Sequence, residues 1–312
     1  MSAHAIIYGT IAIDTLITPG GRANSVLGGS GPYAALAARL LTDRAHLAGV
    51  VGDDFPDEFT RALEARGVDM RHVDRAAGKT FVWTGEYEED MNNRRSVSTL
   101  EGVQETWEMN LCPELRGCEL AVACNVTPRL QLRLLEQCSG AKFTMADFME
   151  SWILRERGYV DALLARVDIA LMNDSEARVF AGTDDALEAG HALLAAGPRY
   201  AVVKHGSAGA TLFHKAEGAA APRIFRCPAW PLIRPQDPTG AGDAFMGAFA
   251  GYLTTCLNGG SPAWEDMKRA MAIATVVAAA VCEKFGTVSL FALTSRELAR
   301  RLAQFREMTN WE

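Results

Sequence analysis

Short apolar segments alternate with longer amphipathic segments along most of this chain. The short segments have the length and apolar content of buried strands. They cover residues 5–13, 45–52, 120–126, 142–148, 169–173 and 200–206. Apolar residues between them recur at three- and four-residue spacing, which predicts helices over 30–41, 53–67, 127–139, 153–167, 175–182 and 185–197. This alternation predicts an α/β fold with a mostly parallel central sheet and helices on both faces.

One segment departs from the alternation. Residues 79–103 are rich in β-branched and aromatic side chains, with a turn-like Met91-Asn92-Asn93 in the middle. We interpret it as a small β excursion, either a lid over a cleft or an ordinary edge hairpin. We therefore predict a single domain over residues 1–312, with a β lid formed mainly by about 79–104 and part of 13–26. The Ala-rich stretch 271–286 is expected to be a helix buried against the sheet.

Charge and composition exclude several classes of protein. The net charge of -7 leaves no basic excess for a general nucleic-acid binder. No apolar run reaches the roughly 18 residues of a membrane span, and the first residues lack the basic start of a secretory signal. The 7 cysteines form no CxxC pair, which favours reduced thiols in a cytoplasm. We expect a cytoplasmic protein that binds neither nucleic acid nor membrane.

The most informative stretch is DPTGAGDAF, residues 237–245, where a polar loop enters a helical pattern. Gly240 and Gly242 allow backbone amides to converge on an anion, and the positive end of the following helix favours a phosphate there. Asp243 fits two interpretations: a capping carboxylate at the helix start, or a base beside a phosphate cradle. A cradle next to a carboxylate is the arrangement that phosphoryl transfer to an alcohol requires.

This stretch resembles the C-terminal signature of the ribokinase-like (PfkB) carbohydrate kinase family, and the resemblance extends over nearly the whole chain. It implies a ribokinase-like fold and an ATP-dependent kinase acting on a sugar or sugar-like molecule, or alternatively on a nucleoside. It also implies that Gly240, Ala241 and Gly242 form the anion hole and that Asp243 is the catalytic base. Mg²⁺ is the expected metal, and a monovalent cation is left open.

The N-terminal half carries a partial match to the same family. Gly28-Gly29 precedes a predicted helix where family members have a glycine pair, and Asp14 resembles the family aspartate that holds substrate hydroxyls. Tyr33 stands where many members have an asparagine, so it departs from the pattern of sugar kinases. Asp147 lies at the carboxyl end of a predicted strand, where α/β folds bind ligands. These residues are the expected substrate contacts, and the turn role of Asp14 is the alternative.

Two further elements resemble the nucleotide site of the family. Asn173 and Glu176 match its Asn-x-x-Glu element, which implies water-mediated contact to Mg²⁺ and phosphates, although the same spacing also forms a capping box. Gly206 and Gly209 match its nucleotide loop. Lys204 replaces a common threonine, and it is expected either to reach a phosphate or to be a solvated strand end.

Two rival functions fit parts of the sequence. Residues 29–34 fit GxGxxA, and Asp53 follows about twenty residues later, as in dinucleotide-binding dehydrogenases. However, only the short run 24–27 could serve as the preceding strand, and DPTGAGDAF would have no role. The other rival is a non-catalytic family member that binds a sugar or nucleoside, which Asp243 argues against because folding alone does not need it. Pairing of two copies through the lid is a further expectation.

Overall fold

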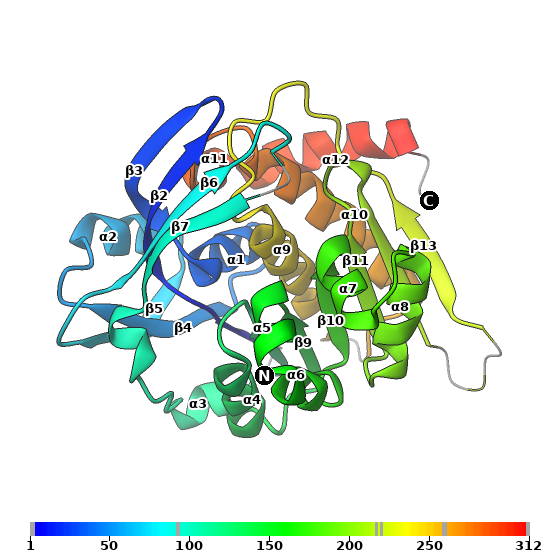
Figure 1. Ribbon diagram of the computed structural model, residues 1–312, viewed down its shortest axis with the longest axis horizontal. Helices are drawn as coiled ribbons and strands as arrows, with labels where there is room; N and C mark the ends of the chain where they lie inside the picture. Colours follow the sequence, from blue (N-terminus) through cyan, green and yellow to red (C-terminus); the bar gives the residue numbers. More distant parts are fainter. Residues whose placement is uncertain (1–3, 92–93, 216–217, 219–220, 258–260, 310–312) are drawn as a thin grey trace.

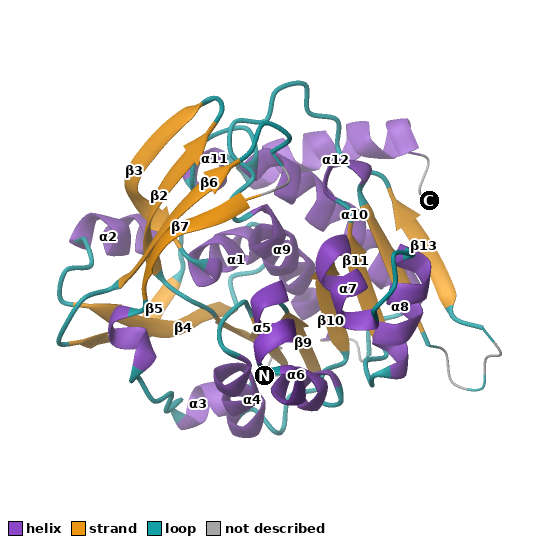
Figure 2. Cartoon of the chain, viewed as in Figure 1, coloured by secondary structure: helices purple, strands orange, loops and turns teal. Residues whose placement is uncertain are grey.

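The computed structural model describes residues 4–91, 94–215, 218, 221–257 and 261–309. A nine-stranded sheet forms the centre of the molecule (Figure 2). In sheet order its strands are β13 (Arg223–Cys227), β12 (Ala210–His214), β11 (Tyr200–Lys204), β10 (Ile169–Asn173), β9 (Phe143–Asp147), β8 (Leu120–Ala123), β1 (Ala5–Tyr8), β4 (Ala45–Gly52) and β5 (Asp69–Ala76). The run from β11 to β5 is parallel, and β12 and β13 continue it in antiparallel pairing.

Two apolar cores lie on opposite faces of this sheet. Alternate residues of β1 divide between them, with Ile7 in one core and Ile6 in the other, as the two-residue period of a strand requires. One face carries α1 (Ser30–Arg39), α2 (Asp57–Ala65), α9 (Ala241–Cys256), α10 (Trp264–Val281), α11 (Val288–Ala292) and α12 (Ser295–Thr309). The other carries α3 (Pro113–Arg116), α4 (Pro128–Gln137), α5 (Glu150–Arg155), α6 (Arg157–Leu164), α7 (Asp174–Ala181) and α8 (Ala186–Ala195). The predicted fold class is confirmed.

A second, four-stranded sheet stands beside the first, at the upper left of Figure 1. Its order is β3 (Gly21–Gly28), β2 (Ala12–Thr18), β6 (Phe81–Tyr87) and β7 (Arg94–Leu100). These strands occupy the two segments expected to form a lid, and Met91 in the β6–β7 turn has a positive φ of 57°. Asn92 and Asn93 lie outside the described residues. Closure of this sheet over a substrate and pairing of two copies through it stay predictions.

The sequence-based boundaries differ from the structure in three places. The predicted first strand 5–13 is two strands, because the chain leaves the large sheet after Tyr8 and enters the small one at Ala12. Gly9 lies at this exit, and a Cβ there would meet Ser30 Oγ at 2.6 Å. The predicted helix 153–167 is divided between α5 and α6. Strands β5, β12 and β13 were not predicted.

The dehydrogenase interpretation fails on topology. The residues before Gly29 form β3, which belongs to the small sheet and pairs antiparallel with β2. A dinucleotide fold needs that strand in the parallel sheet, next to the strand that follows the helix. The motif therefore lacks its β-α-β unit.

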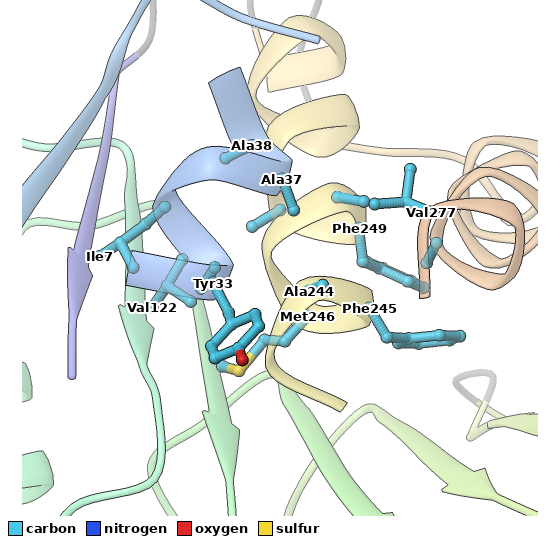
Figure 3. Packing of buried hydrophobic residues seen from close by; sticks show 14 of the residues in the cluster. Ile7, Tyr33, Ala37, Ala38, Val122, Ala244, Phe245, Met246, Phe249 and Val277 are labelled. Atoms are coloured by element: carbon cyan, nitrogen blue, oxygen red, sulfur yellow. The ribbon is translucent and has the colours of Figure 1, made fainter. Parts of the chain in front are cut away.

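Helix α9 is held deep in the molecule by contact with α1 (Figure 3). A Cβ on Gly247 would lie 2.1 Å from the carbonyl oxygen of Ala34, and one on Gly251 would lie 2.8 Å from that of Ala38. Small residues on both helices thus bring the two backbones together. This packing fixes the amino terminus of α9, where the DPTGAGDAF loop ends.

The Ala-rich stretch expected to be buried forms most of α10, whose residues from Met271 to Val277 are all buried. It packs on α9 within the first core. No helix in the described part of the chain combines the length and the apolar character required to cross a membrane.

Candidate active site

The loop 237–240 turns sharply into α9. Gly240 is the N-cap residue with a left-handed φ of 77°, and no side chain caps this helix end. Asp237 is fully buried and holds the loop, since its carboxylate accepts hydrogen bonds from Thr239 N at 2.9 Å and Gly286 N at 2.8 Å. Asp243 lies in the first turn of α9, where a carboxylate matches the positive end of the helix, and among the described residues no side-chain hydrogen bond caps this end.

Two cavities lie on either side of the α9 amino terminus. The Asp14 cavity, of about 430 Å³, includes Asp14, Gly29, Tyr33, Gly240 and Asp243 in its wall. The Trp230 cavity, of about 470 Å³, includes Lys204, Gly206, Gly209, Trp230, Ala241 and Gly242. The first turn of α9 therefore contributes to both walls, and a group transferred between the two cavities would pass its backbone amides.

Asp243 faces a mixed electrostatic environment. Burial raises the pKa of its carboxyl to about 6, and the nearby Asp147 carboxylate acts in the same direction. The charges of Lys204 and Arg94 oppose the rise. An acid with a pKa close to neutrality can take up and release a proton at physiological pH, which suits a general base.

Asp14 lies on β2 in the wall of the Asp14 cavity, with only 3% of its surface exposed. Its Oδ2 accepts a hydrogen bond from Gly29 N at 3.3 Å, whereas its buried Oδ1 has no hydrogen-bond partner in the part of the chain that the structure describes. Burial raises the pKa of Asp14 to about 7. A buried acceptor without a partner is costly unless a ligand supplies the donor.

The glycine pair gives Asp14 its position. A Cβ on Gly28 would lie 1.8 Å from Asp14 Oδ2, and Gly29 has a positive φ of 85°. Of the two expected substrate contacts, Gly29 lines the Asp14 cavity and Gly28 lies behind the carboxylate. The close approach to Asp14 requires a glycine at position 28, and contact of Gly28 with a substrate stays a prediction.

Tyr33 is buried beneath Gly240. Its ring atoms would be 2.3 to 2.5 Å from a Cβ on that glycine, and its hydroxyl has no hydrogen-bond partner within the described ranges. Burial raises the pKa of the phenol well above its usual value. The structure thus places Tyr33 in the wall of the Asp14 cavity, as expected, and shows that it also shapes the phosphate loop.

The nucleotide-loop glycines lie together at the Trp230 cavity. Gly206 begins the short helix η2 (Gly206–Ala208), and Gly209 follows it with a φ of 95°. A Cβ on Gly209 would meet the carbonyl oxygen of Cys227 at 2.1 Å. The positive φ of 55° at Gly206 and the close contact at Gly209 favour glycine at both positions of the cavity wall.

Asn173 and Glu176 form the capping box of α7. Asn173 Oδ1 accepts from Glu176 N at 2.8 Å, and Glu176 Oε2 accepts from Asn173 N at 2.7 Å. Neither residue is in the wall of the two cavities as described. Burial raises the pKa of Glu176 to about 7, while the Lys204 ammonium opposes the rise.

Asp147 and Lys204 form a buried ion pair that the sequence did not predict. Lys204 Nζ donates to Asp147 Oδ1 at 2.7 Å, and the two side chains are 15% and 8% exposed. The solvated strand end considered for Lys204 is therefore wrong. Asp147, expected to contact substrate, faces Lys204 and is absent from the described wall of the Asp14 cavity.

Two other residues of the Asp14 cavity, Asn125 and Trp152, went unrecognised in the sequence. Asn125 follows β8, its Oδ1 accepts from Trp152 Nε1 at 3.3 Å, and both residues line the cavity. The position of Asn125 just beyond the carboxyl end of a parallel strand was the available signal. Two residues of the small sheet, Trp83 and Arg94, line the same cavity, with Arg94 Cζ 5.8 Å from the centre of the Trp83 ring.

Gly240→Ala tests the loop geometry. We expect it to lower stability by about 1 kcal/mol for the left-handed backbone and by about 1–3 kcal/mol more for the clash with Tyr33. Gly182→Ala is the matched control, because Gly182 has a φ of 68° but nothing within 4 Å of the added Cβ. Urea unfolding of both variants gives the difference between their free energies of unfolding. Equal losses would show that the Tyr33 ring does not constrain the loop.

Comparison with known proteins agrees with this geometry. Residues 7–293 match the pfkB family of carbohydrate kinases. A cytidine kinase of Thermococcus kodakarensis is 32% identical over 255 residues, which are 79% of this chain and 87% of that protein.

Solved structures with a similar fold come from the same group of kinases. A nucleoside kinase of Burkholderia thailandensis in complex with inosine has a TM-score of 0.79 at 20% identity, over 98% of each chain. A ribokinase of Arabidopsis thaliana complexed with ribose and ATP has a TM-score of 0.73 at 18% identity, over 97% of this chain and 99% of that one. The chain belongs to the pfkB family of carbohydrate kinases and is a phosphotransferase that uses ATP to phosphorylate an alcohol of a sugar or sugar-like molecule.

Proposed function

We propose that this enzyme is an ATP-dependent ribonucleoside kinase that phosphorylates the 5′-hydroxyl. The observation that carries the proposal is Asp14, a buried carboxylate in the wall of a cavity that aromatic residues also line, with one oxygen that lacks a hydrogen-bond partner among the described residues. Two carboxylate oxygens side by side suit the two donors of a vicinal diol. The 2′- and 3′-hydroxyls of a ribonucleoside form such a diol.

With the diol at Asp14, the positions of the nucleobase and of the 5′-hydroxyl in the cavity follow. The Asp14 cavity continues past the carboxylate to Phe81, Trp83 and Trp152, whose rings offer an apolar wall to a nucleobase. With the diol at Asp14 and the base on C1′, the free hydroxyl of the ribose is the one on C5′. Asp243, in the same cavity wall, is the acid available to it.

The proposed reaction uses residues on both sides of α9. Asp243 accepts the proton of the 5′-hydroxyl as its oxygen attacks the terminal phosphorus of ATP, and the bond to the β-phosphate oxygen breaks. Backbone amides of Gly240, Ala241 and Gly242 hold the charge that develops on the transferring group. Closure of the small sheet over the Asp14 cavity excludes water, which would otherwise compete with the hydroxyl.

Mg²⁺ would be held mainly by the phosphates, because this ion keeps several waters and takes few protein ligands. Glu176 fits a water-mediated role: it is buried, at 7% exposure, and one of its oxygens is engaged by Asn173 N. No cluster of three or more metal-ligating side chains occurs in the described ranges, as is ordinary for an ion bound through phosphate. When bound, the ion neutralises charge on the phosphates.

The relatives support this acceptor class. The curated protein with 32% identity is named a cytidine kinase, and a structural neighbour was solved with inosine. Ribose is the alternative acceptor, and it would leave the cavity next to Trp83 and Trp152 without a partner.

ADP release by the purified enzyme tests the acceptor class. Ribonucleosides, 2′-deoxyribonucleosides, ribose and hexoses are compared at the same ATP and Mg²⁺ concentrations. We expect at least one ribonucleoside to exceed ribose in kcat/KM by about 10²-fold, since ribose makes no contact with the aromatic wall. Equal or greater activity on ribose would overturn the nucleoside assignment while leaving the phosphotransferase intact.

The rate should depend on pH in the range where Asp243 titrates. Its carboxylate is the active form, and its pKa is raised from 3.8 to about 6, so activity is lost as pH falls through that value. We expect kcat/KM, which follows the titration of the free enzyme, to decline by at least about tenfold per unit below pH 6 and to be level above pH 8. Melting temperatures over the same range separate this loss from unfolding. A level kcat/KM down to pH 5 would contradict the assignment of Asp243 as base.

A further inference from the structure

The Lys204 ammonium lies at the phosphate cradle. A Cβ on Gly242 would come within 3.3 Å of Lys204 Nζ, so the ammonium lies against the first turn of α9. Lys204 also lines the Trp230 cavity together with Gly206 and Gly209. A cation held at a helix amino terminus, next to a cavity that ends in backbone amides, is placed to bind an anion.

The Lys204 side chain is held at this position by its ion pair with Asp147. Lys204 ends β11 and Asp147 ends β9, with β10 between them in the parallel sheet. The lysine must therefore reach across β10, about two strand spacings of roughly 4.8 Å each, to meet the carboxylate. The 2.7 Å hydrogen bond to Asp147 Oδ1 holds the ammonium there.

The charges around Lys204 keep it protonated. Burial alone lowers the pKa of Lys204, but Asp147 and Glu176 more than offset this, and its pKa lies above the usual value. Asp243 contributes in the same direction. An ammonium has three donors, and the bond to Asp147 uses one of them, which leaves donors for a ligand.

Stability alone gives little reason for such a pair. A buried ion pair commonly adds nothing over apolar residues of similar size, because removing both charges from water offsets their attraction. The pair instead lies at the carboxyl ends of parallel strands, where α/β folds bind ligands. This favours a functional role for the ammonium.

We infer that the Lys204 ammonium binds the terminal phosphoryl group of ATP during transfer, and that Asp147 is the positioning residue that directs it there. The inference rests on the proposed phosphoryl transfer at Asp243. It assigns part of the charge neutralisation to a protein cation, in addition to the part that the α9 amides supply. It also gives Asp147 a role that does not involve the acceptor substrate.

The affinity of the enzyme for nucleotides, measured without an acceptor substrate, tests the role of Lys204. Lys204→Met removes the ammonium and keeps the length of the side chain, and Lys204→Met with Asp147→Asn also removes the carboxylate that would be left unpaired. We expect both to bind the methylene analogue of ATP about tenfold more weakly, with affinity for ADP within about twofold of the original. Lys142→Met, at an exposed lysine before β9, is the control and should change neither affinity.

Kinetics separate catalysis from folding. The double variant should lose about 10²- to 10³-fold in kcat, with little change in KM for the acceptor, while its melting temperature shows that it is folded. Asp147→Asn alone should lower kcat by about tenfold at unchanged acceptor KM, because the ammonium loses its anchor. Asp147→Glu should recover part of that loss.

The inference is overturned if the double variant keeps full kcat, or if ADP and the ATP analogue lose affinity equally. Failure of the proposed nucleoside kinase function would give a different result from failure of this inference. If the unmodified enzyme phosphorylates no nucleoside, the binding comparison between ADP and the ATP analogue still decides the role of Lys204.

Discussion

Asp243→Asn should lower kcat by about 10³-fold, the usual scale for loss of a general base. The amide keeps the shape of the side chain but cannot accept the hydroxyl proton. Because the Asp243 carboxyl is held at a raised pKa by burial, its replacement removes a costly charge, and the folded protein should be at least as stable at pH 8. Rapid-quench measurement of a single turnover gives the chemical step directly.

Two controls make this result specific. Asp174→Asn changes another carboxylate in the first turn of a helix, α7, and should leave kcat unaltered. Thermal stabilisation of Asp243→Asn by the acceptor and by an ATP analogue should match that of the original enzyme. A turnover rate within about tenfold of the original would mean that the proton goes elsewhere.

Asp14→Asn should lower kcat/KM for a ribonucleoside by about 10²-fold, because hydrogen bonds from two hydroxyls to a charged acceptor are weakened. The loss should be smaller for the matching 2′-deoxyribonucleoside, which lacks one of the two donors. Comparing enzyme variants against both substrates forms a double-mutant cycle for the diol contact. Equal losses on both substrates would show that Asp14 does not bind the 2′-hydroxyl.

The same substitution should raise stability. The pKa of Asp14 is raised from 3.8 in the unfolded chain to about 7 in the folded one, so the folded state holds its proton more tightly. Stability therefore falls as pH rises from about 4 to 7, and the ionised form is unfavourable above that range. The amide introduced by Asp14→Asn carries no charge, so the variant should melt at a higher temperature than the original at pH 8. A lower melting temperature would show that the ionised carboxylate is structurally required.

The sequence identified the parts of the site whose signal is local. DPTGAGDAF carries its own turn, glycines and helix start within nine residues, and the structure forms all three as predicted. The same holds for the Asn173–Glu176 capping box, which spacing alone indicates. Local chemistry of this kind depends little on the rest of the chain, so it can be predicted before the fold is known.

Contacts between distant segments could not be predicted in the same way. The Asp147–Lys204 pair joins residues 57 positions apart, and it forms only because β9 and β11 flank β10 in the sheet. Periodicity gave the existence of these strands but not their order. The place of Gly28 behind Asp14 likewise depends on the pairing of β2 with β3 in the small sheet. The alternation of strand and helix segments, which predicts the large sheet, does not indicate this pairing.

Tyr33 shows how a departure from a family pattern can have a structural role that the sequence does not indicate. Its position suggested a changed substrate contact, and the structure adds a steric role, because the ring lies under Gly240 and requires that residue to lack a Cβ. Among the described residues the buried hydroxyl has no hydrogen-bond partner, and Tyr33 lines the Asp14 cavity. One residue therefore links the shape of the phosphate loop to the acceptor side.

The position of the transferred phosphate tests the central claim most directly. Cytidine and ATP labelled in the terminal phosphate are incubated with the enzyme, and the labelled product is analysed by phosphorus–proton coupling in NMR spectra. If Asp14 holds the diol while Asp243 activates the remaining hydroxyl, the phosphorus couples to the protons on C5′ alone. Coupling to the protons on C2′ or C3′, or label found only in free phosphate, would contradict this arrangement.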